Sequence, residues 1–162
     1  KGGMTMYYFA YGSNMDTNDL QKWCIHHGKD FPVNNFTCTA FLEDYKLVFN
    51  YFSRGRNGGA ANIMESQGDI VYGIIFQINE NDRATLRVKE GHPKYYHEIS
   101  VTVKSLLDQK KIHAITYKVV NKKERETHQK PTKEYMNLIL KNAKEYNFPK
   151  DYIQYLESIE TQ

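Results

Sequence analysis

A short apolar run near the start of the chain ends abruptly at a small-residue turn, and this break constrains the fold more than any other feature. Residues 7–10 can form a buried strand, and Gly12 frees the backbone directly after it. Asp16 and Thr17 then offer side-chain oxygens that can cap a following helix. A strand, a glycine turn and a helix start in this order aim several backbone N–H groups at one point, which is typical of an anion-binding nest. A tight turn without any ligand has the same spacing, so the pattern alone leaves both interpretations open.

The rest of the chain predicts a β-rich body followed by a helical tail. Hydrophobic alternation and short apolar runs predict strands over residues 36–52, 60–64, 70–78, 95–103 and 112–120. Asn79 is placed to cap a short helix, helical spacing takes over from Tyr135, and Pro149 begins a last helix. Neither repeats nor linkers interrupt this order. We therefore predict one α+β domain over residues 4–162, with residues 1–3 expected to be a cloning remnant.

Composition excludes several classes of protein. With 162 residues and 40% hydrophobic content, the chain has the size and apolar content of one globular domain. Two cysteines without metal-ligand spacing argue against a disulfide framework or a zinc site, and no apolar run approaches the roughly 20 residues of a membrane span. Lysines alternate with acids, as in residues 122–126, so the net charge of +3 does not indicate a nucleic-acid partner. We expect a cytoplasmic protein with neither a nucleic-acid nor a membrane partner.

Few side chains stand in a pattern that carries known chemistry. No serine, histidine and aspartate form a recognisable nucleophile elbow, and the histidines are scattered rather than at metal-ligand spacing. The glycine-rich segment 55–59 is not followed by the lysine and hydroxyl residue of a phosphate loop. These residues favour a reaction that uses a carboxylate and backbone donors, without a metal or another cofactor.

Five segments, in order, resemble the motifs of the γ-glutamylcyclotransferase family, within the AIG2-like superfamily. They are Tyr-Gly-Ser-Asn at 11–14, Asn-Gly-Gly-Ala-Ala-Asn-Ile at 57–63, the apolar run at 68–76, Lys-Glu-Gly at 89–91 with Tyr96 beyond it, and Pro-Thr-Lys-Glu-Tyr at 131–135. The resemblance spans about residues 7–160. It implies a small mixed β-barrel with peripheral helices. It also implies a cofactor-independent enzyme that converts γ-glutamyl-amino acids to 5-oxoproline and the free amino acid.

The resemblance also implies roles for particular residues. Glu90, just before Gly91 where a helix hands over to a strand, matches the catalytic glutamate that acts as base and then as acid. Glu98 is the nearest rival, and we interpret it as a rim or surface residue. The turn after the first strand is expected to bind the α-carboxylate of the γ-glutamyl group, and three later tyrosines are expected to line the pocket. The predicted substrate-binding residues are Tyr8, Phe9, Ala10, Tyr11, Gly12, Ser13, Asn14, Tyr96, Tyr117 and Tyr135.

The chain departs from the family pattern at three places. Asn62 stands where a threonine is usual, residues 53–57 match nothing, and residues 91–94 are one residue shorter than in the vertebrate-type enzymes. These departures leave the leaving group open, so a γ-glutamylamine cyclotransferase is an alternative. A non-catalytic binding module on the same fold is another. The oligomeric state is open as well, a homodimer included.

Overall fold

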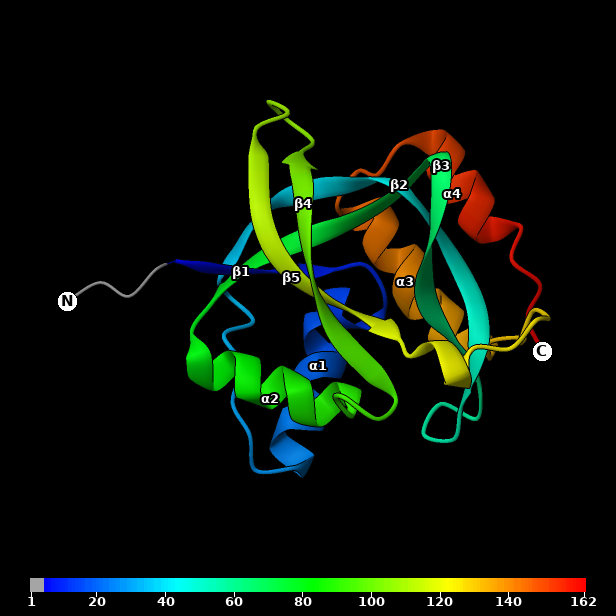
Figure 1. Cartoon of the computed structure of the whole chain (residues 1–162), viewed down its shortest axis with the longest axis horizontal. Coiled ribbons are helices and arrows are strands. Elements are labelled where there is room, and N and C mark those ends of the chain that lie inside the picture. Colours follow the sequence, from blue (N-terminus) through cyan, green and yellow to red (C-terminus); the bar gives the residue numbers. More distant parts are fainter. Residues whose placement is uncertain (1–4) are drawn as a thin grey trace.

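A closed barrel forms the centre of the computed structural model, which describes residues 5–162 (Figure 1). Its five strands follow the order β1-β3-β2-β4-β5, where only β1 and β5 pair in parallel. The predicted α+β class with a small mixed barrel is therefore confirmed. The expected cloning remnant at residues 1–3 lies outside the described residues. The strands are β1 (Met6–Ala10), β2 (Phe36–Ser53), β3 (Gly58–Ile78), β4 (Tyr96–Ser105) and β5 (Lys111–Val119).

The two strands expected over residues 60–64 and 70–78 are one continuous strand, β3, and the prediction of two strands is wrong. Both halves pair with β2, and the ladder shifts register between them instead of ending. At the shift, Asp44 and Gly68 have φ values of 62° and 87°, and the Gly68 N–H donates to the Asp44 carboxylate at 2.9 Å. The polar segment around Gly68, which has the composition of a turn, is thus a bulge that bends the paired strands.

Helices cover the barrel at two places (Figure 1). The elements α1 (Thr17–His26) and α2 (Glu80–Glu90) lie on one side, and α3 (Lys133–Glu145) and α4 (Lys150–Glu157) lie on another. Two short 3-10 turns, η1 (Ser13–Met15) and η2 (Asn121–Lys123), complete the described chain. The cap predicted at Asp16 is confirmed, since its carboxylate accepts from the N–H of Asp19 at 2.9 Å. Within residues 5–162, no helix is both long enough and apolar enough to cross a membrane.

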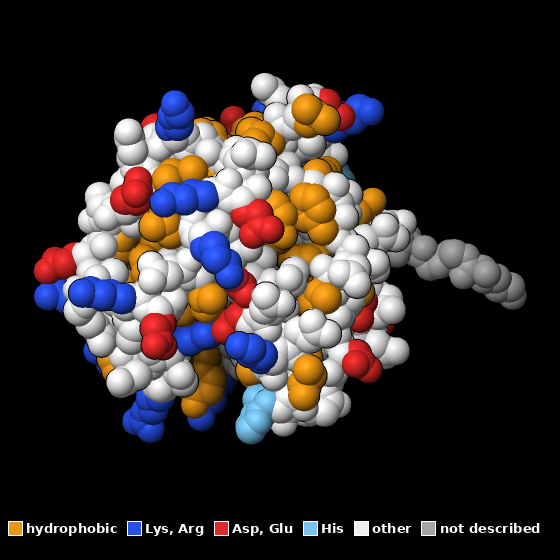
Figure 2. All heavy atoms as spheres, turned by 180° about the vertical axis from the view of Figure 1, so that it is seen from behind, with side chains coloured by type: hydrophobic (Ala, Val, Ile, Leu, Met, Phe, Trp, Pro, Cys, Tyr) orange, Lys and Arg blue, Asp and Glu red, His pale blue; other side chains and the backbone are white. Residues whose placement is uncertain are grey.

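The core lies inside the barrel and under the helices. Phe9, Ile74 and Phe76 are fully buried between the strands, and Leu20 and Ile139 bring α1 and α3 onto the same core. On the face seen from behind, Lys and Arg side chains are interspersed with Asp and Glu (Figure 2). The short β1 pairs with both β3 and β5, so the turn that follows it emerges at one mouth of the barrel.

Candidate active site

A cavity of about 630 Å³ opens at this mouth of the barrel. Its walls come from the turn after β1, α1, the β2–β3 loop, the end of α2 and the start of β4. All but two of the predicted site residues line it, although they come from distant parts of the sequence. These residues are Tyr8, Tyr11, Gly12, Ser13, Asn14, Glu90, Tyr96, Tyr117 and Tyr135.

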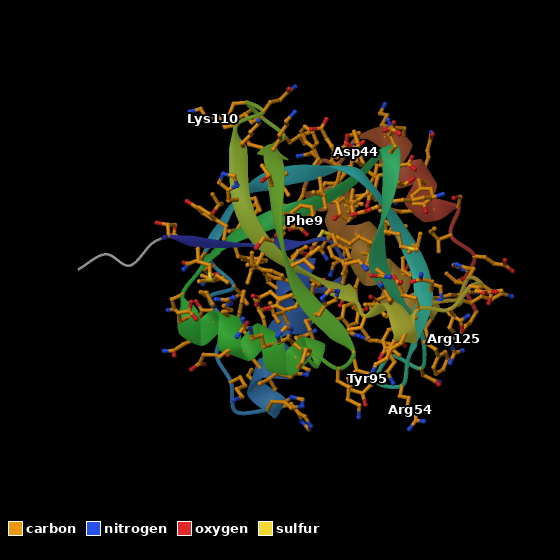
Figure 3. The ribbon with its side chains drawn as sticks, viewed as in Figure 1. Phe9, Asp44, Arg54, Tyr95, Lys110 and Arg125 are labelled. Carbon is orange, nitrogen blue, oxygen red and sulfur yellow. The ribbon has the colours of Figure 1, made fainter. Side chains whose placement is uncertain are left out.

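Phe9 and Ala10 are the two exceptions, because they do not line the cavity, and their expected contact with substrate stays a prediction. Phe9 is fully buried in the middle of the barrel (Figure 3), and Ala10 is 1% exposed. Successive side chains of a strand point to opposite faces, so Phe9 points away from the face that carries Tyr8. Ala10 pairs with Ile74 of β3 and does not reach the cavity. Both residues support the strand that carries the turn.

The turn after β1 presents unpaired backbone donors. The carbonyl groups of Gly12 and Ser13 accept from the N–H groups of Met15 and Asp16, at 3.1 and 3.0 Å. No acceptor for the N–H groups of Gly12, Ser13 and Asn14 is present within residues 5–162. The first N–H groups of a helical turn carry partial positive charge, so this turn can bind an anion.

The carboxylate of Glu90 faces the cavity from the end of α2. Gly91 ends the helix with φ 65°, and a Cβ at Gly91 would lie 2.8 Å from the ring of Tyr95, so a glycine is needed there. Within the described part of the chain, the Glu90 carboxylate has neither a hydrogen bond nor an ion pair. Burial raises the pKa of Glu90, while the positive charges of Lys89 and Arg56 act against this rise. Glu90 can therefore hold a proton at a higher pH than an ordinary glutamate.

Glu98, expected at the rim or the surface, is not an exposed acid, because its side chain is mostly buried and paired. Its side chain is only 9% exposed and accepts from Arg83 Nη2 at 2.5 Å, Arg87 Nε at 3.0 Å and the Tyr117 hydroxyl at 2.9 Å. Burial acts to raise the pKa of Glu98, but the hydrogen bonds from these three side chains lower it to about 2. This carboxylate stays ionised over the physiological range and does not line the cavity.

Three of the cavity tyrosines use their hydroxyl hydrogens within the protein. Tyr11 donates to the carbonyl of Tyr117 at 2.5 Å, and Tyr117 itself donates to Glu98. Tyr96 donates to the carbonyl of Ala61 at 2.7 Å. These three side chains are fixed parts of the cavity wall.

Tyr8 and Tyr135 have the opposite pattern, because they accept hydrogen bonds from the protein. The Tyr8 hydroxyl accepts from the Asn14 side-chain amide at 2.8 Å, and the Tyr135 hydroxyl accepts from the N–H of Ala61 at 2.9 Å. The hydroxyl hydrogen of Tyr8 remains to be donated to a ligand, and the Tyr135 hydroxyl lies beside the Ser13 side chain. The side-chain oxygen of Asn14 is also buried without a donor among residues 5–162, so it can accept from a ligand.

Arg56 is a cavity residue that local sequence patterns do not reveal. Its Nη2 lies 2.6 Å from the carboxylate of Asp19 and 3.2 Å from the Ser13 hydroxyl, and its guanidinium lies 5.2 Å from the ring centroid of Tyr135. The β2–β3 loop, which matches no family motif, is thereby tied to α1 and to the turn at residues 12–14. The only sequence signal is one arginine in a glycine-rich loop, and its partner is distant in the chain.

Two further observations bear on what the cavity can hold. The acids that line it are Asp19, which is paired with Arg56, and Glu90, which has no partner in the described chain. Lys89 also lines the cavity, and burial lowers the pKa of its ammonium. Within residues 5–162, no three His, Cys, Asp or Glu side chains gather into a set that could hold a metal ion.

Asn62, which replaces the usual threonine, has a structural position. It is fully buried, and its side-chain nitrogen donates to Asn50 at 2.9 Å and to Glu124 at 2.6 Å. Its side-chain oxygen accepts from the N–H of Val119 at 2.9 Å. This amide links β2, β3 and β5 and is absent from the cavity wall, so the substitution does not alter the site directly.

The chain is similar to known proteins over nearly its whole length. The AIG2-like family matches residues 70–156 of the chain. A γ-glutamylcyclotransferase of Mus musculus is 32% identical over 98% of this chain and 80% of its own length, and one of Bos taurus is 34% identical over the same shares. A solved structure named γ-glutamyl cyclotransferase has a TM-score of 0.83 and 29% identity, covering 98% of this chain and 90% of that one. The chain therefore belongs to the γ-glutamylcyclotransferase family.

Proposed function

We propose that this chain is a γ-glutamylcyclotransferase that converts γ-glutamyl-amino acids to 5-oxoproline and the free amino acid without a cofactor. The observation that carries the proposal is the unpaired carboxylate of Glu90, which shares one cavity with the unpaired donors of residues 12–14. The relatives of this family bear the name of the same activity.

The reaction needs no nucleophile from the protein. The α-nitrogen of the substrate forms a bond to its own γ-carbonyl carbon, and the amide bond to the leaving amino acid breaks. Two protons leave the attacking nitrogen, and the leaving nitrogen gains two, so no net proton is exchanged with water. The protein must hold the substrate folded back on itself, where proximity supplies several kcal/mol of the barrier lowering.

We assign the α-carboxylate of the substrate to the turn after β1. The N–H groups of Gly12, Ser13 and Asn14 supply donors for it, and Arg56 adds a positive charge beside the Ser13 hydroxyl. The unpartnered side-chain oxygen of Asn14 is placed to accept from the α-ammonium of the same substrate. These contacts hold both charges of the γ-glutamyl group at one end of the cavity.

Glu90 is the group that we assign to proton transfer. Only the free amine attacks, so the ionised carboxylate first removes a proton from the ammonium and later returns one to the leaving nitrogen. The raised pKa of Glu90 narrows the gap to the pKa of the ammonium, which makes the transfer more efficient. A binding module without catalysis has no need for an unpaired carboxylate in such a cavity.

The proposal includes a cytoplasmic location. Both cysteines of the chain, Cys24 and Cys38, are unpaired thiols, and Cys24 is buried. Reduced cysteines suit the reducing conditions of the cytosol.

The test is to incubate the purified protein with γ-glutamyl-alanine and to measure 5-oxoproline and alanine. We expect both products in equal amounts, at a rate that a chelator does not change. Parallel arms use intact glutathione and a γ-glutamylamine, and we expect both to react slowly. A faster reaction of the γ-glutamylamine would replace the proposed substrate, and the absence of 5-oxoproline from every substrate would contradict the proposal.

A further inference from the structure

A second cavity, of about 620 Å³, adjoins the one that holds Glu90. The two share Tyr51, Ser53, Gly55 and Tyr95 as lining residues, so they lie side by side along a common wall. The second cavity lies between the tip of the β2–β3 loop, the residue before β4 and η2. Arg54, Tyr95 and Arg125 mark this end of the molecule in Figure 3.

The lining of the second cavity carries uncompensated positive charge. Arg54, Lys122, Lys123 and Arg125 all line it, and none of them has an acidic partner within residues 5–162. Its acidic residue, Glu124, is already engaged. The Glu124 carboxylate lies 3.7 Å from the ammonium of Lys118 and accepts from the side chain of Asn62 at 2.6 Å. An anion that enters this cavity therefore meets cations that are free to bind it.

Aromatic rings hold two of these cations at the cavity. The ammonium of Lys123 lies 5.2 Å from the ring centroid of Tyr95, and the guanidinium of Arg125 lies 5.5 Å from that of Phe52. Arg125 also donates to the side chain of Gln129 at 2.9 Å. Such contacts restrict long side chains that would otherwise spread into solvent, which reduces the entropy lost when a ligand binds.

The shared wall connects these cations to the reaction. Tyr51 and Tyr95 line both cavities, and Glu90 lines the first, so these cations lie next to the cavity that holds Glu90. In the proposed function, the γ-glutamyl end of the substrate occupies the space between Glu90 and the turn at residues 12–14. The leaving group must extend beyond the amide that breaks, and the second cavity adjoins this space.

We propose that the second cavity binds the leaving group and favours acidic leaving amino acids over neutral ones of the same size. This inference rests on the proposed function and deepens it. Every leaving amino acid carries one carboxylate, whereas glutamate and aspartate carry two. The second carboxylate is negatively charged, so it can pair with Arg54, Lys123 and Arg125, which have no acidic partner within residues 5–162. Lys123 and Arg125 are therefore specificity-determining residues.

The test compares kcat/KM for γ-glutamyl-glutamate and γ-glutamyl-glutamine, which differ by one charge and have nearly the same shape. We expect the acidic substrate to be favoured by roughly 2- to 10-fold at low salt, because exposed ion pairs contribute about 0.2–1 kcal/mol each. The preference should shrink as salt is added. Lys123→Gln and Arg125→Gln should each move the ratio toward one, and a ratio is insensitive to a general loss of folded protein.

Lys110→Gln is the matched control, because it removes the same charge from an exposed lysine at the opposite end of the molecule (Figure 3). This variant should keep the wild-type ratio. Equal kcat/KM values for the two substrates, or a ratio that Lys123→Gln and Arg125→Gln leave unchanged, would overturn the inference. The absence of 5-oxoproline from both substrates would overturn the proposed function instead, so the two failures are distinguishable.

Discussion

Two glutamates near the mouth of the barrel show how strongly the surroundings decide what a carboxylate can do. Glu90 has no partner within the described residues and faces the cavity, and burial raises its pKa. Glu98 is held by Arg83, Arg87 and Tyr117, and its pKa is lowered to about 2. The first can hold a proton at a higher pH than an ordinary glutamate, whereas the second stays ionised down to low pH. The same residue type is therefore unpaired and open to a ligand in one place, and held by three side chains in the other.

A single helix creates both environments. Arg83 and Arg87 are one turn apart, so they lie on one face of α2 and both reach Glu98 on β4. Glu90 is the last residue of the same helix, and the left-handed Gly91 turns the chain away directly after it. Side chains on one face of α2 thus pair with Glu98, while Glu90 at the end of α2 faces the cavity.

The largest effect is expected for Glu90→Gln. Glutamine keeps the shape and nearly the same volume but cannot exchange a proton, so kcat should fall by about 10²- to 10⁴-fold while a γ-glutamyl ligand still binds. Steady-state kinetics and ligand titration check this. Glu98→Gln is the matched variant and should lose less than about tenfold, through a weaker hold on Tyr117. A fully active Glu90→Gln protein would end the assignment.

Gly12→Val should separate substrate binding from proton transfer. A Cβ at Gly12 would lie 3.3 Å from the Cβ of Ala61, so a valine must displace the turn that presents the N–H groups of Ser13 and Asn14. We expect KM to rise by roughly 10- to 100-fold, because charge-assisted hydrogen bonds to the α-carboxylate are lost. Circular dichroism shows whether the variant is folded. An unchanged KM in a folded variant would place the carboxylate elsewhere.

The pH dependence of kcat/KM should follow Glu90 and ignore Glu98. A base must be ionised, so activity should fall about tenfold per pH unit below the pKa of Glu90. Because that pKa is raised, the fall should begin above the ordinary glutamate value of about 4.3. Glu98→Gln should keep this acidic limb in place. A profile that stays flat to pH values near 4 would exclude a Glu90 base with a raised pKa.

The smallest effects concern stability, where the two glutamates should have opposite signs. Because the pKa of Glu90 is raised in the folded protein, its contribution to stability is fully present below its unfolded pKa of about 4.3. This contribution is lost as the pH rises through the folded pKa. Glu90→Gln should therefore raise Tm at pH 7. Because the pKa of Glu98 is lowered in the folded protein, Glu98 stabilises the fold at pH values above its unfolded pKa of about 4.3. This stabilisation is lost as the pH falls through the folded pKa of about 2.

Glu98→Gln should therefore lower the free energy of unfolding at pH 7. We expect a loss of about 1–3 kcal/mol, because hydrogen bonds to two arginines that are themselves partly exposed are weakened. Thermal unfolding of the two variants beside the wild-type protein checks both signs. Equal shifts in Tm would mean that the two environments do not differ as described.

Local patterns were sufficient to predict most of the elements. The strand, turn and helix near the N-terminus, the cap at Asp16 and the helix that ends at Glu90 all depend on neighbours close in sequence. The family resemblance placed Glu90, Tyr96 and Tyr135, and the structure brings them to one cavity. The prediction of two strands within β3 failed because the bulge at Gly68 looks like a turn until its partner strand is known.

The missed features depend on contacts between distant segments. Arg56 meets Asp19 only after the barrel brings the β2–β3 loop beside α1. Glu98 meets Arg83 only because α2 packs along β4. An alternating strand pattern predicts which face a side chain occupies, but it does not predict which charges lie opposite that face. Sequence reasoning therefore placed Glu98 on the surface.

The most direct test of the account is a carbon NMR titration of the Glu90 and Glu98 side-chain carboxyls in one sample of the protein. We expect Glu90 to titrate above the ordinary value of about 4.3, and Glu98 to remain ionised down to a pH of about 3. Glu90→Gln and Glu98→Gln samples assign the two signals. Titration of Glu90 at or below the ordinary value, or of both residues at the same pH, would contradict the distinction on which the assignment of Glu90 rests.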